Sequence, residues 1–538
     1  MKENKENQNI DQFLEDEELV EKSDIYAIIE EMFAKKENMS LLKTYILNYV
    51  QFINNIDKMT VNPNNFMSLT QLEEQITLLI EKSKMFANQL TIDKLSKIDE
   101  GGIIQKKKEE YLSKGVKLRI YRRLPRTVMT IHGKIPFSRT ALIGSSPSDC
   151  DRLSDLGLGI NVFPFDELTG ISILPFKMSV QAMLETAFWV QKSSSYVAAA
   201  RILARGTGIG IDPDTVRMVA NHIGEIVFNN DMKEAEKVTS LLNSGKLEFP
   251  TEKKKGILYI ETDGALLHTR QKDEQGSGWK ENKLGMVFSS DFFKRWINKK
   301  GELQHSIGKR EYITYVGEAE IFKMHLFALA LRNGYGQYKE TVLISDGATW
   351  IRNMKEELFP DAQQILDFFH LCENISTFGK AVFDMDEQKY KPWLDEIIDL
   401  FKNSQTNEAI KKINSLGKKN LAKSKFNLLG YINNNINNID YAEYKKRGYF
   451  IGSGAIESAN RTVLQERLKR PGMRWNKQTG QYILTLMSKA KSDISRGCIA
   501  TNGIWKRDVE QAISSKYEVR GFVDFAHNVL PFAHMVET

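Results

Sequence analysis

Between positions 256 and 369, apolar residues occur in short strand-like runs and in one longer run with helical spacing. The strand-like runs predict five strands, at Ile257–His268, Leu284–Ser289, Glu311–Val316, Val342–Ile344 and Gln364–Phe368. The remaining apolar positions predict helices at Ala319–Arg332 and Trp350–Leu358. Val342–Ile344 is continuously apolar, as in strands buried within parallel sheets. The pattern therefore predicts an α/β core with a mixed five-stranded sheet.

Three antiparallel strands followed by helix, strand, helix and strand is the element order of an RNase H-like catalytic core. Helical spacing in the rest of the chain, broken by basic and glycine-containing stretches, predicts the other regions. We divide the chain into 1–100 (acidic tail and helical N-terminal region), 101–176 (basic linker and β-hairpin around His132-Gly133-Lys134), 177–245 (helical), 246–369 (first part of the core), 370–445 (all-helical insertion), 446–495 (closing helices of the core) and 496–538 (C-terminal tail).

Region 177–245 contains a helix, a short alanine-rich helix, a glycine-containing turn and another helix. Asp212 before Pro213 is a strong signal for the start of the last helix. Its apolar stripe leaves Arg217 and Asn221 on another face. This arrangement is helix-turn-helix-like, and its last helix could read a DNA groove. A plain helical bundle would give the same pattern, so both interpretations stay open.

Composition narrows the class of protein. The chain has 538 residues, 41% hydrophobic and 27% charged, which fits a globular protein of several domains. We find no apolar stretch of about 18 residues that would predict a membrane span. Three well-separated cysteines give neither a disulfide scaffold nor a paired metal motif. We expect a cytoplasmic, nucleoid-associated protein with no membrane partner.

The net charge of +6 is unevenly distributed. The first 24 residues are strongly acidic, whereas residues 106–126 and 461–477 are strongly basic and contain aromatic side chains. Such runs are often only solvated surfaces, but bases with aromatics also suit contact with a nucleic acid backbone. In the second run the candidate DNA contacts are Arg461, Arg467, Lys469, Arg470, Arg474 and Trp475.

Three acidic residues stand where a metal site would need them. Asp263 and Asp346 each follow an apolar run that predicts a strand, and Glu457 lies in a Gly-Ser-Gly-Ala-Ile-Glu segment before the basic run. A buried carboxylate without a partner is unfavourable, so a cation is a natural partner. Two Mg²⁺ (or Mn²⁺) ions about 3.5–4 Å apart can promote displacement at phosphorus. Capping of a strand or helix is the alternative role of each acid.

Other polar residues lie close to this predicted site. Asp367 and His370 follow the fifth strand at a spacing that lets both face one cleft. His370 could move a proton or contact phosphate, or it could be a core histidine bonded to Asp367. Lys283 opens the second strand beside Asp263 and could hold a phosphate, or be solvated. Zinc binding by His370 and Cys372 is rejected because further ligands are missing nearby.

Four blocks, YIETDGA, ISDGATWI, ILDFFHLCENI and GSGAIESANRTVLQERLKRPGMRW, resemble bacterial insertion-sequence DDE transposases of the ISLre type, which are related to Mutator-like transposases. The resemblance covers about residues 120–490. It implies that Asp263, Asp346 and Glu457 form the metal-binding triad, and that Asp367 and His370 match an Asp-x-x-His signature. It also implies binding of terminal inverted repeats by the region upstream of Asp263, and a homo-oligomer.

We therefore expect a DNA transposase that cleaves double-stranded DNA at element ends and joins the freed 3′ end to target DNA. Two alternatives remain open. One is a catalytically idle or domesticated DNA-binding regulator, against which the intact triad argues. The other is a structure-selective RNase H-like nuclease, a class that is usually smaller and lacks so large a helical insertion.

Overall fold

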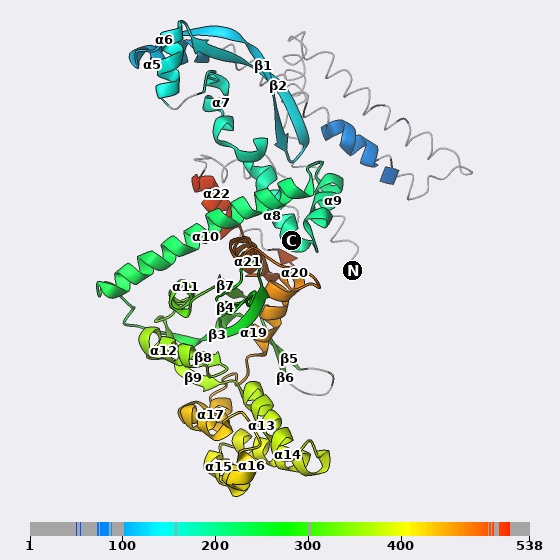
Figure 1. Ribbon diagram of the computed structural model, residues 1–538, viewed down its shortest axis with the longest axis vertical. Helices are drawn as coiled ribbons and strands as arrows, with labels where there is room; N and C mark the ends of the chain where they lie inside the picture. Colours follow the sequence, from blue (N-terminus) through cyan, green and yellow to red (C-terminus); the bar gives the residue numbers. More distant parts are fainter. Residues whose placement is uncertain are drawn as a thin grey trace, which may run out of the picture. The chain divides into compact units, whose positions relative to one another are not determined.

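A computed structural model of the chain describes residues 102–156, 159–297, 303–492 and 505–516, together with isolated positions and short segments elsewhere (Figure 1). The acidic N-terminal run, most of the helices predicted between 25 and 98, and the end of the C-terminal tail lie outside the described residues. The chain forms two compact units. Unit 1 is residues 1–179 with 207–209, and unit 2 is residues 180–206 with 210–538.

Unit 1 is built on a long β-hairpin. β1 (Leu118–Thr130) pairs antiparallel with β2 (Gly133–Gly144), with a register shift after Ile120, so the predicted basic hairpin is confirmed. Because alternate side chains of a strand point to opposite faces, one face can be buried by helices while the other stays polar. The short elements of the unit are α5 (Ile103–Ser113), α6 (Pro147–Asp155), α7 (Pro164–Leu168), η2 (Ile171–Ile173) and η3 (Pro175–Lys177).

Unit 2 contains a five-stranded sheet with the order β7-β4-β3-β8-β9. Its strands are β3 (Lys254–His268), β4 (Trp279–Ser289), β7 (Arg310–Val316), β8 (Tyr338–Ser345) and β9 (Gln363–Leu366). β4 pairs antiparallel with both β3 and β7, whereas β8 pairs parallel with both β3 and β9. The mixed α/β fold with a mixed five-stranded sheet is thereby confirmed.

Helices cover this sheet and form its core. α11 (Ala319–Arg332) and α12 (Thr349–Leu358) pack on it, burying Phe322, Leu326 and Met354 against strand residues such as Ile260 and Leu343. α21 (Lys477–Ser492) packs along β7. Since a sheet that carries parallel strands needs both faces covered, these helices account for the continuously apolar strands.

Three further helices belong to the same unit as the sheet. α8 (Val180–Lys192) and α9 (Tyr196–Gly206) precede α10 (Pro213–Asn243), and Asp212 caps α10 as predicted by accepting from the Thr215 amide. α10 packs against α21 and α11, with Gly224 so close to Tyr482 that a Cβ would clash. This long helix is therefore part of the core of unit 2.

The predicted insertion is helical. Figure 1 shows most of its helices gathered beside β9, at one end of unit 2. They are α13 (Phe368–Val382), α14 (Glu387–Lys402), α15 (Thr406–Ser415), α16 (Gly417–Leu421), α17 (Leu428–Asn434), η5 (Ile436–Asn438) and α18 (Tyr441–Lys446). The chain then returns through α19 (Gly454–Ala459), the π-helical η6 (Asn460–Gln465) and α20 (Glu466–Leu468) before α21.

Two local features differ from the expectations. The fifth strand ends at Leu366, because the Asp367 side chain accepts a hydrogen bond from the Phe369 amide and starts α13. The sequence pattern also missed the hairpin of β5 (Phe293–Ile297) and β6 (Leu303–Ile307). The remaining elements are η4 (Ser290–Phe292), β10 (Ile494–Ser495), β11 (Cys498–Ile499), η7 (Trp505–Glu510) and α22 (Gln511–Lys516). Among the described residues, no helix has the length and apolar character needed to cross a membrane.

Candidate metal centre

Two predicted site residues come from adjacent parallel strands: Asp263 lies within β3, and Asp346 directly follows β8. Glu261 on β3 pairs with Ile344 on β8, the last pair of that parallel register. Asp263 and Asp346 each come two residues later, so continuation of the register sets them side by side where the two strands part. Both are half-buried. The fold thus brings together two acids that are distant in the sequence.

The third acid, Glu457, reaches this edge of the sheet on α19. Two hydrogen bonds tie the helical segment to β3: the Ile456 amide donates to Glu261 Oε2 at 3.0 Å, and Asn460 Nδ2 donates to Asp263 Oδ2 at 2.6 Å. Glu457 lies between these two anchors in the sequence. Its position relative to β3 is therefore fixed by contacts on both sides.

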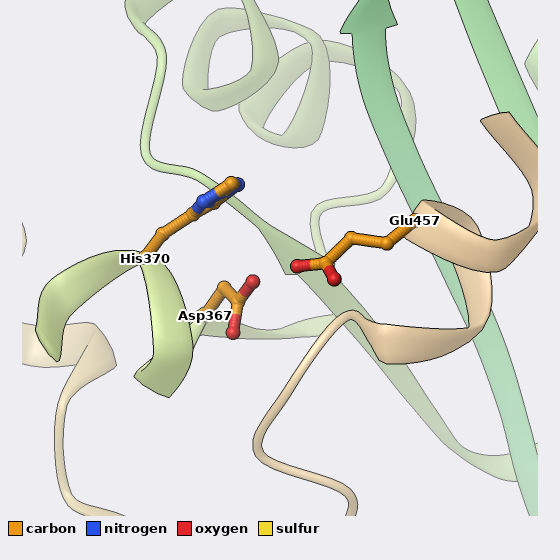
Figure 2. Close-up of side chains that lie close together, drawn as sticks. All are labelled: Asp367, His370 and Glu457. Carbon is orange, nitrogen blue, oxygen red and sulfur yellow. The ribbon is translucent and has the colours of Figure 1, made fainter. Parts of the chain in front are cut away.

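Glu457 forms a close group with Asp367 and His370. One potential ligand atom from each of these residues lies within 4.8 Å of the other two, and among the described residues this is the group that meets that criterion. Figure 2 shows the Glu457 carboxylate pointing from α19 toward the first turn of α13, which carries both partners. Asp263 and Asp346 stand outside this tight group. The predicted spacing of Asp367 and His370 does place both in one site.

The charges of the neighbouring site residues affect the pKa values of Asp263 and Glu457. Burial raises the pKa of Asp263, and the negative charge of Asp346 raises it further, while His370 opposes this. Burial likewise raises the pKa of Glu457, as do the charges of Asp367 and Asp263. Repulsion among carboxylates raises their pKa values in this way, and a nearby cation relieves it. The site is therefore arranged to attract positive charge.

Glu261 was not among the predicted site residues. Its side chain is 1% exposed, and burial raises its pKa to about 8, although the hydrogen bond from Ile456 opposes this. Glu261 and Asp263 are two residues apart on one strand, so both side chains point to the same face. A carboxylate directly after the apolar run Ile257–Ile260 was the available signal. Glu261 is a positioning residue for α19.

The donor set suits a hard divalent cation. Carboxylate oxygens are the ligands that Mg²⁺ prefers, and Mn²⁺ accepts both carboxylate and imidazole. Asp367 is held in place because its Oδ1 accepts from the Phe369 amide at 2.9 Å and its Oδ2 accepts from the Ser453 hydroxyl. An oxygen with one hydrogen bond still has a lone pair for a metal. Asp367, His370 and Glu457 could therefore hold a divalent cation such as Mn²⁺.

Lys283 lies inside the protein and not at an open phosphate site. Its side chain is only 6% exposed, and its Nζ donates to Glu281 Oε2 at 2.6 Å and to the Gly317 carbonyl at 2.9 Å. Lys283 pairs with Gly264 across β3 and β4, next to Asp263, as its position in the sequence suggested. In this conformation its charge is satisfied by Glu281.

The basic segment after Glu457 is divided between surface and interior. Arg467 is 2% exposed, and its guanidinium lies over the rings of Tyr196 and Trp475 at 4.8 and 5.4 Å from their centroids. Trp475 is 8% exposed and donates from Nε1 to the Leu468 carbonyl. Both therefore stabilise packing here, unlike the surface contacts we expected. The exposed members are Arg461, Lys469, Arg470 and Arg474.

On α10, the two candidate DNA-reading residues differ in exposure. Arg217 is exposed and pairs loosely with Asp214 at 3.4 Å, whereas Asn221 is half-buried. Neither residue belongs to the acidic site described above. Their predicted role in groove reading stays a prediction.

Comparison with known proteins adds one finding. No curated protein matches the sequence. The model of one protein family matches residues 62–507, a span that includes the β-hairpin of unit 1, the sheet, the helical insertion and every residue of the acidic site. That span is most of the chain. The chain therefore belongs to the uncharacterised protein family UPF0236.

Proposed function

We propose that this protein is a DNA transposase, which cleaves DNA at element ends and joins the freed ends to target DNA in a metal-dependent reaction. The observation that supports the proposal is the position of Asp263 beside Asp346 on neighbouring parallel segments, with Glu457 on a helix that is hydrogen-bonded to β3. Asp263 lies within β3, Asp346 directly follows the neighbouring parallel strand β8, and the helix that carries Glu457 is held to β3 by the Glu261–Ile456 and Asn460–Asp263 hydrogen bonds. Such a cluster of carboxylates on rigid elements suits phosphoryl transfer.

The sheet order also favours this function. A central β3 with antiparallel β4 on one side, β7 beyond β4, and parallel β8 and β9 on the other side is the order that an RNase H-like core requires. Acids from the first and fourth strands of such a core, with one from a closing helix, would share a single site. We propose that β3, β8 and α19 form this core, with residues 368–446 as its helical insertion.

Each side chain has a distinct role in the proposed reaction. Asp263, Asp346 and Glu457 would hold the cations, and Asp367 would complete their shell. Bound Mg²⁺ or Mn²⁺ would activate the attacking oxygen and stabilise the leaving oxygen. His370 faces the same space and could accept a proton from the attacking water or 3′ hydroxyl. Ser453 and Glu261 keep Asp367 and α19 in position.

The exposed bases next to α19 provide a surface for DNA. Arg461, Lys469, Arg470 and Arg474 are exposed, follow Glu457 within 17 residues, and can neutralise backbone phosphates. We propose that double-stranded DNA, both the terminal inverted repeats and the target, is the substrate, and that the protein acts as a homo-oligomer on it. Arg217 and Asn221 on α10 are further candidates for DNA contact.

The proposal is tested with DNA taken from both sides of the gene. Purified full-length protein is incubated with labelled end fragments and a supercoiled target plasmid, with Mg²⁺, Mn²⁺ or EDTA. A transposase nicks the end fragment and produces a joined product, and EDTA abolishes both. Binding without cleavage would instead indicate a regulator. Cleavage of branched DNA without joined products would indicate a structure-selective nuclease.

A further inference from the structure

A cavity of about 630 Å³ adjoins the candidate metal centre. Asp346 and His370 form part of its wall. The rest comes from the turn and helix start after β8, from α13, and from α17 with the loop before it. The helical insertion therefore does more than extend the core, because it lines an open cavity directly beside two of the proposed active-site residues.

The insertion is braced against Asp346 itself. The Tyr431 hydroxyl donates to the Asp346 carbonyl at 2.8 Å. Gly347 has a left-handed φ of 84°, and a Cβ there would lie 3.0 Å from the amide of the buried Asn435. Only glycine adopts this conformation readily at such close approach. These contacts fix the cavity wall relative to the proposed metal ligand.

The lining combines flat rings, amides and one guanidinium. Phe426 and Tyr431 are half-buried, with ring centroids 5.6 Å apart. The Arg352 Nη1 donates to the Asn434 carbonyl at 3.2 Å, which directs the guanidinium to the cavity wall. Amide side chains, which can both donate and accept, come from Asn374, Asn427, Asn434 and Asn435.

We infer that this cavity binds one unstacked nucleotide of the DNA strand, next to the phosphate that is cleaved. The rings can stack on a base, the amides can pair with its polar edge, and Arg352 can contact a flanking phosphate. A base within a duplex exposes only its edges, so stacking on Phe426 or Tyr431 requires it to leave the helix. A small free anion suits the cavity less well, because Asp346 and Glu373 also line it.

This inference rests on the proposed function but is tested separately from cleavage. The probe is a single-stranded thymidine oligonucleotide with one 5-iododeoxyuridine, which crosslinks under ultraviolet light to aromatic side chains stacked on it. Full-length Asp263→Asn protein is used with Ca²⁺, so that cleavage is not needed. We expect the crosslinked peptide to contain Phe426 or Tyr431. Crosslinks only at other sites, or none, would overturn the inference.

Variants provide the second readout. Phe426→Ala should lower crosslink yield and oligonucleotide affinity about tenfold, because loss of stacking on one base weakens binding by about that factor. Arg352→Gln should weaken binding about tenfold, and Arg352→Lys should restore part of it. The controls are Ile436→Ala, exposed beside α17, and Lys355→Ala, on α12 outside the cavity lining. Equal losses in the controls would overturn the inference.

The two proposals fail in different ways. Crosslinking at Phe426 or Tyr431 by a protein that never cleaves DNA would support the nucleotide site and contradict the proposed transposase function. Cleavage and joining by a protein that crosslinks only at other residues would support the proposed transposase function and contradict the nucleotide site.

Discussion

The carboxylate of Glu261 accepts a hydrogen bond at 3.0 Å from the backbone amide of Ile456, 195 residues further along the chain. This bond joins the central strand β3 to the helix that carries Glu457. A buried backbone amide left without an acceptor destabilises a protein by about 1–3 kcal/mol. The helix therefore depends on Glu261 for its position, and so does Glu457, the acid that it presents to the candidate metal centre.

Substitution of Glu261 should separate hydrogen bonding from charge. Because burial raises the pKa of Glu261 to about 8, its neutral form is favoured more than in an ordinary glutamate, and Glu261→Gln keeps both shape and acceptor. We expect Glu261→Gln to retain most DNA cleavage and Glu261→Ala to lose about tenfold or more. The readouts are the cleavage rate and its Mn²⁺ dependence, with melting temperature as the check on folding. Equal activity of both variants would show that this bond does not position Glu457.

The three acids should each be essential for cleavage. Asp263→Asn, Asp346→Asn and Glu457→Gln should each lower the cleavage rate about 1,000-fold or more, because metal ligands contribute several kcal/mol to transition-state stabilisation. DNA binding, measured by fluorescence anisotropy, should be largely retained. Asp395→Asn, an exposed acid on α14, is the matched control and should cleave normally. Wild-type activity in one of the three variants would show that the substituted residue is not part of the catalytic metal site.

The exposed bases after Glu457 should contribute to the salt dependence of DNA binding. Arg470→Ala combined with Arg474→Ala should reduce the slope of log K against log salt by about 1.8, because each lost phosphate contact contributes about 0.9 to the slope. Arg467→Ala should instead lower thermal stability, because the buried Arg467 packs over Tyr196 and Trp475. An unchanged slope in the double variant would mean that these two arginines do not contact DNA.

A buried ion network should make unit 2 sensitive to acid. Although burial opposes it, Lys489 and Arg507 lower the pKa of Asp508 from 3.8, and Arg332 and Arg507 lower that of Glu311 from 4.5. A carboxyl whose pKa is lower in the folded state stabilises the protein above its unfolded pKa and loses this as pH falls. The free energy of unfolding should therefore decline below about pH 4.5.

Asp508→Asn tests this network directly. Asp508 Oδ2 lies 3.0 Å from Lys489 Nζ, and removal of one partner from a buried pair destabilises a protein by about 3 kcal/mol. Urea denaturation at pH 7 and pH 4 should show that the variant is less stable at pH 7 and loses less on acidification. Parallel declines in both proteins would assign the acid sensitivity to other groups.

The sequence predicted the sheet because each strand is a short apolar run in a diagnostic order. It also identified Asp367 and His370, since a spacing of three residues places both on one side of a helix start. The spacing of the buried residues places Arg467 on the same helical stripe as Ile456 and Val463, so its burial follows from an apolar pattern that we overlooked. Its contact with Tyr196 joins distant segments of the chain, so no local pattern contains it. The role of Glu261 depends on a contact across 195 residues, which no local pattern contains.

The most direct test is Mn²⁺ binding, followed by electron paramagnetic resonance in the full-length protein and its variants. If Asp263, Asp346 and Glu457 share the cations, then Asp263→Asn, Asp346→Asn and Glu457→Gln should each weaken Mn²⁺ binding about tenfold or more, with Asp395→Asn unchanged. The contradicting result would be wild-type Mn²⁺ affinity in Asp263→Asn and Asp346→Asn, with loss only in Asp367→Asn, His370→Ala and Glu457→Gln. That pattern would assign the ion to Asp367, His370 and Glu457 alone.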